Sequence, residues 1–106
     1  MPADQLLSLV QLCVRTGQFA KGDALLPSIQ TTKAKLVVMS EACGANRAKK
    51  IRDKCAYYHV PLLVLPALRF NGISSKVNMA VALLDQGFAS KAIELAKREG
   101  LMEENV

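Results

Sequence analysis

Short apolar runs alternate along the chain with stretches whose apolar side chains have helical spacing. Residues 35–39 and 60–65 are apolar runs, and residues 45–58 between them place apolar side chains about one helical turn apart. Two apolar runs joined by a helix indicate a β-α-β unit with buried parallel strands. Residues 40–44 interrupt the first run and are expected to form the loop before the helix.

Two longer amphipathic helices are predicted near the ends of the chain. The first follows Asp4, a candidate N-cap, and ends at Gly17, because glycine readily takes the left-handed conformation that closes a helix. Its apolar stripe, widened by Leu9 and Leu12, consists of Leu6, Leu7, Val10, Cys13 and Val14. The other helix is capped by Asp85 and ends at Gly100. Its inner stripe is expected to be Phe88, Ala92, Leu95 and Ala96.

The remaining segments are short. Residues 18–21 predict a very short strand, and Gly22-Asp23 a turn that offers a helix cap. Residues 24–29 predict a helix that is short or begins late, because Pro27 fits only near a first turn. Residues 66–72 predict one or two helical turns anchored by Leu68 and Phe70. Residues 77–84 predict the last strand, and the acidic tail 101–106 is expected to be frayed. This alternation predicts an α/β fold, a three-layer α/β/α sandwich around a small mixed sheet.

Length and hydropathy set the class of protein. A chain of 106 residues, 51% of them hydrophobic, predicts a single globular domain over residues 1–106. No apolar stretch approaches the roughly 20 residues needed to span a bilayer, and the N-terminus lacks the features of a signal peptide. We therefore expect a cytoplasmic protein with no membrane partner. No element indicates an obligate oligomer, so a monomer is expected.

Positive charge is concentrated in the middle of the chain. The net charge is +5, but 11 basic and 3 acidic residues fall between Arg15 and Lys76, and five of the basic residues lie within residues 45–58. A polyanion would therefore meet this middle part. Within the predicted helix, Arg47, Lys50 and Lys54 form a row beside the apolar face. A solvated, charge-laced surface is the alternative interpretation.

The sequence offers little for catalysis or metal binding. Cys13, Cys43 and Cys55 are widely spaced and His59 is the only histidine, so Cys and His alone cannot form a four-ligand zinc site. Cys13 and Cys55 fall on apolar faces and are expected in the core. Common phosphate-binding and nucleophile motifs are absent, so no enzyme activity, cofactor or metal is expected.

Four segments, taken in order, resemble one known family. They are Arg15-Thr16-Gly17, residues 33–38 followed by Glu41-Ala42, residues 53–61, and residues 85–89. Together they resemble the ribosomal L-seven-Ae/L-thirty-e family of kink-turn RNA-binding proteins, in particular its bacterial, cytoplasmic, ribosome-associated type. The resemblance runs from about Leu6 to Ala96.

The resemblance implies an α/β/α sandwich that binds sharply bent RNA along one edge of the fold. The turn at residues 21–24 would meet phosphates and sheared G·A pairs, with the loop at 40–44 and the start of the next helix close by. A loop before the last strand would cover a flipped-out base. Tyr57 and Tyr58 are expected to pack rather than to stack on RNA. The RNA-binding residues that the resemblance implies are Lys21, Gly22, Asp23, Glu41, Asn46, Arg47, Lys50, Lys76, Val77 and Met79.

One segment departs from the family pattern. The family carries Gly-x-Asn-Glu-x-x-Lys in the second-helix turn, whereas here Gly22 is followed by Asp23 and Ala24, with Pro27 near the place of the lysine. The resulting hypothesis is a non-catalytic RNA-binding protein, ribosome-associated, that stabilises a kink-turn or related structured RNA. The alternative is a protein–protein scaffold on the same fold that has lost RNA binding.

Overall fold

The structure is a computed structural model that describes residues 5–66, 70, 80–100 and 102–103. Its described strands form one five-stranded mixed sheet in the order β1-β4-β2-β3-β5. In chain order the elements are α1 (Gln5–Arg15), β1 (Phe19–Ala20), the 3₁₀ helix η1 (Gly22–Ala24), α2 (Leu25–Gln30), β2 (Leu36–Ser40), α3 (Ala45–Tyr58), β3 (Leu62–Leu65), β4 (Ala80–Leu83), α5 (Gln86–Glu99) and β5 (Met102–Glu103).

The predicted β-α-β unit forms the centre of the sheet. β2 and β3 are parallel, with Val37 opposite Leu62 and Ser40 opposite Leu65, and α3 connects them. β4 pairs antiparallel with the other side of β2, and β1 pairs antiparallel with β4. All five residues of β2 are buried, because helices cover both faces of the sheet.

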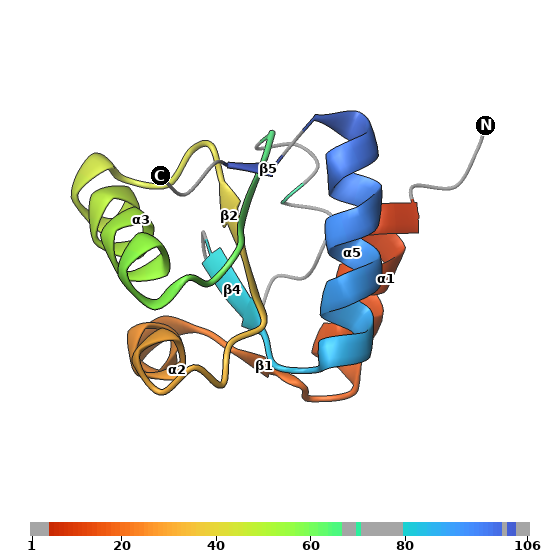
Figure 1. The fold of residues 1–106 in the computed structure, drawn as a ribbon, viewed down its shortest axis with the longest axis horizontal. Coiled ribbons are helices and arrows are strands. Elements are labelled where there is room, and N and C mark those ends of the chain that lie inside the picture. The colour runs from red at the N-terminus through yellow and green to blue at the C-terminus, as the bar shows by residue number, and fades with distance from the viewer. Residues whose placement is uncertain (1–4, 67–69, 71–79, 101, 104–106) are drawn as a thin grey trace.

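The helices form two layers, one on each face of the sheet (Figure 1). α1 and α5 pack together on one face, and α2 and α3 pack together on the other. Successive side chains of β2 point to opposite faces of the sheet. Val38 belongs to the core under α1 and α5, whereas Val37 and Met39 belong to the core under α2 and α3. The three-layer α/β/α sandwich with a mixed sheet is thus confirmed.

Three predicted helix boundaries are confirmed. Gly17 and Gly100 have φ angles of 78° and 70°, the left-handed conformation that ends α1 and α5. The Asp85 carboxylate accepts a hydrogen bond of 3.0 Å from the Phe88 N–H and so caps α5. α3 has the predicted span but ends on His59 with φ 57°, a left-handed cap that the sequence pattern does not indicate.

Four details differ from expectation. Leu12 is 42% exposed, because it points away from the face of α1 that Val10 and Cys13 bury. Asp23 lies inside η1 and makes no cap, since this 3₁₀ turn shifts the N-cap of α2 to Ala24. Ser40 is the last residue of β2, not the start of the loop.

The acidic tail is the fourth difference. The described part of the tail, β5, is not frayed but pairs antiparallel with β3, Leu62 opposite Glu103 and Leu63 opposite Met102. This pairing satisfies backbone groups of β3 that would otherwise lie on an open sheet edge. The expectations for Leu68 and for residues 77–79 of the last strand fall outside the described residues, whereas Phe70 is buried as predicted.

Candidate nucleic-acid interface

A groove runs between α2 and α3 on the outer surface of one helical layer. It consists of two adjoining hollows with volumes of about 740 and 640 Å³. The first hollow is lined by Gly22, Asp23, Leu25, Leu26, Pro27, Gln30, Asn46, Arg47, Lys50 and Ile51. The second is lined by Leu26, Lys50, Asp53, Lys54, Tyr57 and Tyr58. Because Leu26 and Lys50 border both hollows, we treat them as one feature, the α2–α3 groove.

The first hollow brings together predicted residues that lie far apart in the sequence. Gly22 and Asp23 come from η1, and Asn46, Arg47 and Lys50 come from the first turns of α3. The two segments meet here because α2 packs alongside α3 on the same face of the sheet (Figure 1). Five of the ten predicted RNA-binding residues therefore share one concave surface.

The η1 turn holds its backbone at the edge of this hollow. Gly22 has φ 56°, and a Cβ built on it would have no neighbour within 4 Å, so the space beside this backbone is open. The Ala24 N–H donates a 3.0 Å hydrogen bond to the Lys21 carbonyl and closes the turn. Leu25, 1% exposed, then anchors the start of α2 in the core. A ligand can consequently approach the main chain at Gly22 closely.

A tight turn after β2 places the start of α3 beside the groove. Ser40 is buried, and its hydroxyl accepts a 3.1 Å hydrogen bond from the Ala42 N–H, while the Cys43 N–H donates to the Ser40 carbonyl at 3.0 Å. α3 therefore begins at Ala45, and its first turn carries Asn46 to the groove. The N-terminus of a helix bears a partial positive charge that favours phosphate at this end.

Of the other five predicted RNA-binding residues, two do not line the groove and three lie outside the residues that the structure describes. Lys21 and Glu41 are exposed in the turns before η1 and after β2, but neither borders the two hollows. Lys76, Val77 and Met79 lie outside the described residues, so their predicted contact with a flipped base is untested.

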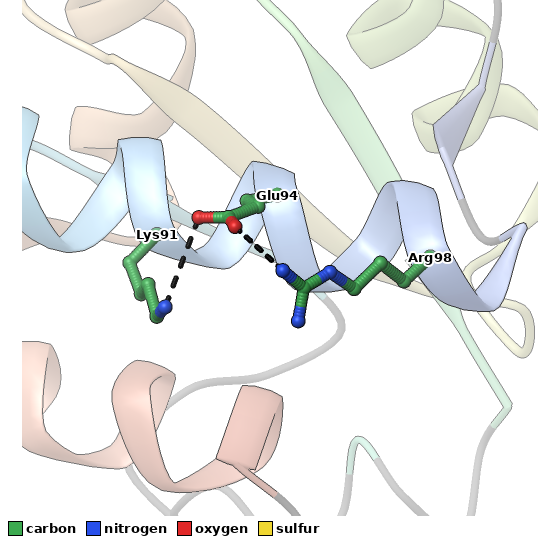
Figure 2. A network of polar contacts seen from close by, with 3 residues as sticks. All are labelled: Lys91, Glu94 and Arg98. Atoms are coloured by element: carbon green, nitrogen blue, oxygen red, sulfur yellow. Dashed lines mark hydrogen bonds and ion pairs between the residues drawn. The ribbon is translucent and has the colours of Figure 1, made fainter.

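The two helical layers differ in their charge. α3 carries five basic residues, Arg47, Lys49, Lys50, Arg52 and Lys54, against one acidic residue, Asp53. On the opposite layer, Glu94 of α5 lies 2.9 Å from Arg98 and 3.7 Å from Lys91 (Figure 2). Two of the three cations of α5 thus share a carboxylate, whereas α3 presents a net positive charge beside the groove. A phosphate backbone is favoured at α3.

The aromatic residues at the end of α3 were only partly predicted. Tyr58 is half-buried and packs against the core under α2 and α3, as expected. Tyr57 is 75% exposed, so its assignment as a packing residue is wrong. The apolar stripe of α3 passes through Cys55 and Tyr58, and a neighbouring residue on a helix points about 100° away from such a stripe. From that spacing, the sequence alone could have predicted that the Tyr57 ring is exposed.

Metal and membrane features are not found in the described part of the chain. There, no group of three or more Cys, His, Asp or Glu side chains could hold a metal ion. No helix within the described ranges is long and apolar enough to cross a membrane.

The three cysteines differ in their surroundings. Cys13 and Cys55 are buried as predicted, and Cys43 is half-buried in the turn before α3. Burial raises the pKa of the Cys55 thiol to about 12. Burial also raises the pKa of Cys13, whose thiol donates a hydrogen bond to the Gln18 carbonyl at 3.0 Å.

We therefore expect a thiol-alkylating reagent at about pH 8 to modify Cys43 first. Thiolates are the reactive species, so raised pKa values and burial protect Cys13 and Cys55 until the protein unfolds. Peptide mass spectrometry over a time course measures the three rates, with a urea-unfolded sample as the reference. Equal rates for Cys43 and Cys55 in the folded protein would contradict the prediction.

No protein-family profile matches the chain. Among curated proteins it is 38% identical over 90 residues to the RNA-binding protein YlxQ of Bacillus subtilis (strain 168), a match that covers 82% of this chain and 90% of the relative. It is 32% identical over 91 residues to the RNA-binding protein YlxQ of Enterococcus faecium, which covers 84% of this chain and 88% of the relative.

Solved structures share the fold. A protein with unknown function from Bacillus halodurans superposes with a TM-score of 0.80 at 26% identity, over 90% of this chain and 99% of the other. The Giardia lamblia 15.5kD RNA binding protein superposes with a TM-score of 0.66 at 16% identity, over 92% of each chain, a likeness that shows the fold alone.

Proposed function

Because this chain belongs to the family of the RNA-binding protein YlxQ, we propose that it is itself a non-catalytic RNA-binding protein. The observation that supports this most is the α2–α3 groove. Its first hollow combines an open backbone at Gly22, an amide at Asn46 and the cations of Arg47 and Lys50. Backbone N–H groups and cations bind phosphates, while amide and carboxylate groups read base edges.

The groove suits folded RNA better than a small molecule. Its cationic side chains border an open surface and belong to a helix that carries five basic residues between Arg47 and Lys54. Such an arrangement can follow a phosphate backbone over several residues. We propose the predicted set as the contact residues: Lys21, Gly22, Asp23, Glu41, Asn46, Arg47, Lys50, Lys76, Val77 and Met79.

The finer proposal is that the RNA contains a kink-turn or a related sharp bend. It draws on the family resemblance and on the position of η1 beside the start of α3. The amide and carboxylate readers of the family pattern are both missing here. Asp23 lies beside their place, and its carboxylate can accept hydrogen bonds from amino groups on base edges. Pro27, on the groove wall, cannot hold a phosphate as a lysine would.

Three further proposals follow from this assignment. The protein acts as a monomer, in the cytoplasm, and associates with the ribosome or with ribosomal RNA. The ribosomal partner is supported by the net positive charge of +5 and by the family resemblance, and the cytoplasmic location by the resemblance. A monomer is the default because no predicted element indicates an obligate oligomer.

A binding titration tests the function. We expect the protein to bind an RNA hairpin that contains a kink-turn, and to bind it more tightly than the same hairpin with its G·A pairs replaced. The logarithm of the affinity should fall linearly with the logarithm of salt concentration, because phosphate contacts release counterions. Equal, salt-dependent affinity for both hairpins would contradict the kink-turn proposal but not RNA binding. No binding to either hairpin at low salt would contradict both.

The scaffold alternative needs a contiguous exposed apolar patch. Among the described residues, the large hydrophobic side chains that are exposed are Leu12 and Tyr57. They lie on α1 and α3, on opposite faces of the sheet. The described surface therefore favours RNA over a protein partner.

A further inference from the structure

We propose that the second hollow of the α2–α3 groove binds an unpaired nucleotide that flanks the structured RNA, with its base stacked on the ring of Tyr57. This inference rests on the proposed function, because the RNA held in the first hollow would deliver the flanking strand. Lys50 and Lys54 would hold its phosphates. None of Lys54, Asp53 and Tyr57 is among the residues that the resemblance implies.

The two hollows form a continuous path along α3. Leu26 and Lys50 line both of them, so an RNA contacted by Arg47 and Lys50 lies directly beside the second hollow. Tyr57 stands two helical turns beyond Lys50, which places it about 10 Å further along the helix axis. That distance suits one or two nucleotides rather than a second helix.

Tyr57 has the properties of a stacking platform. Its side chain is 75% exposed, so a large aromatic face is open to a ligand. Tyr58 contacts it edge to face, with ring centroids 4.8 Å apart and an angle of 74° between the rings. Because Tyr58 is itself half-buried against the core, this contact restricts the orientation of the Tyr57 ring. Bases of any sequence can stack on such a ring.

The charges around the second hollow fit an RNA strand. Lys50 and Lys54 lie one helical turn apart on the same side of α3 and both line the hollow. Asp53, also in its lining, would repel a phosphate but can accept a hydrogen bond from an amino group of a base. A cationic path with an aromatic ring at its end is the usual arrangement for single-stranded nucleic acid. Double-stranded RNA would offer no free base face to Tyr57.

The test compares three RNAs: the kink-turn hairpin with flush ends, the same hairpin with four unpaired nucleotides at its 5′ end, and one with them at its 3′ end. We expect one extension to raise the affinity of the unmodified protein. Tyr57→Ala should remove that gain, a loss of about 5- to 150-fold, and leave the affinity for the flush hairpin unchanged. Tyr57→Phe should keep the gain because it keeps the ring.

A second readout reports stacking directly. 2-Aminopurine placed in the favoured extension should lose fluorescence on binding to the unmodified protein and to Tyr57→Phe, but not to Tyr57→Ala. Leu12→Ala, which truncates the exposed leucine of the opposite layer, is the matched control and should change neither affinity nor fluorescence. Lys54→Ala should reduce the salt slope for the extended hairpin by about 0.7.

The outcomes separate this inference from the proposed function. If the flush hairpin binds but neither extension adds affinity, or if Tyr57→Ala retains the gain, the nucleotide site is refuted and RNA binding stands. If no hairpin binds, the proposed function itself fails. An exposed tyrosine contributes little to folding, so unchanged thermal unfolding of Tyr57→Ala would confirm that any loss arises at the surface.

Discussion

Replacing both Arg47 and Lys50 by glutamate is expected to lower the affinity for structured RNA at least about 100-fold near 0.1 M salt. Each substitution removes one attraction to phosphate and adds one repulsion, and each of these four changes is worth about 1 kcal/mol even at the dielectric constant of water. Both side chains line the first hollow, and Lys50 also borders the second. The salt slope should also decrease, by about 1.5, because two phosphate contacts are lost.

The matched control is Arg15→Glu with Lys97→Glu. These residues lie in the last turns of α1 and α5 in the other layer, are exposed, and give the same change in net charge. We expect the control to change affinity by less than about threefold at this salt concentration, because screening limits the effect of distant charges. Equal losses in the two double variants would mean that net charge, and not the groove, determines binding. Circular dichroism of each variant checks that the fold is retained.

Local patterns predicted the fold well where each element carries its own signal. The span of α3 follows from its apolar spacing, and the ends of α1 and α5 follow from Gly17, Asp85 and Gly100, whose chemistry acts within one turn. The pairing of β5 with β3 could not be predicted in this way. It depends on the open edge of a strand almost forty residues earlier, which no local pattern in the tail reports.

The candidate site was predictable in part for the same reason. Arg47 and Lys50 stand out as basic residues beside an apolar stripe, and Gly22 as a turn residue. That η1 and α3 border one hollow depends on the packing of α2 against α3, which is a tertiary feature. Leu26 and Pro27 were missed because apolar residues in a short helix predict core positions, whereas here they form the wall of a groove.

Ile51→Ala is expected to lower the free energy of unfolding by about 2 to 5 kcal/mol, the usual cost of truncating a fully buried isoleucine. Ile51 is 0% exposed, and the other buried residues of α3 are the smaller Ala48 and Cys55. It is therefore the main apolar anchor between the basic helix and the sheet. Since domains of this size have about 5 to 15 kcal/mol in total, the variant loses a large share of its stability. Urea unfolding followed by circular dichroism measures the loss.

Two control substitutions and an experiment with bound RNA test this prediction further. Ile51→Val should cost only about 0.5 to 1.5 kcal/mol, and Ile93→Ala on α5 less than Ile51→Ala because Ile93 is only partly buried. A bound RNA at 100 times its dissociation constant should restore about 2.7 kcal/mol to Ile51→Ala, since ligands that bind only the native state stabilise it. Restoration by RNA would show that RNA binds the folded variant and not its unfolded chain. A loss below about 1 kcal/mol without RNA would mean that Ile51 does not anchor the helix.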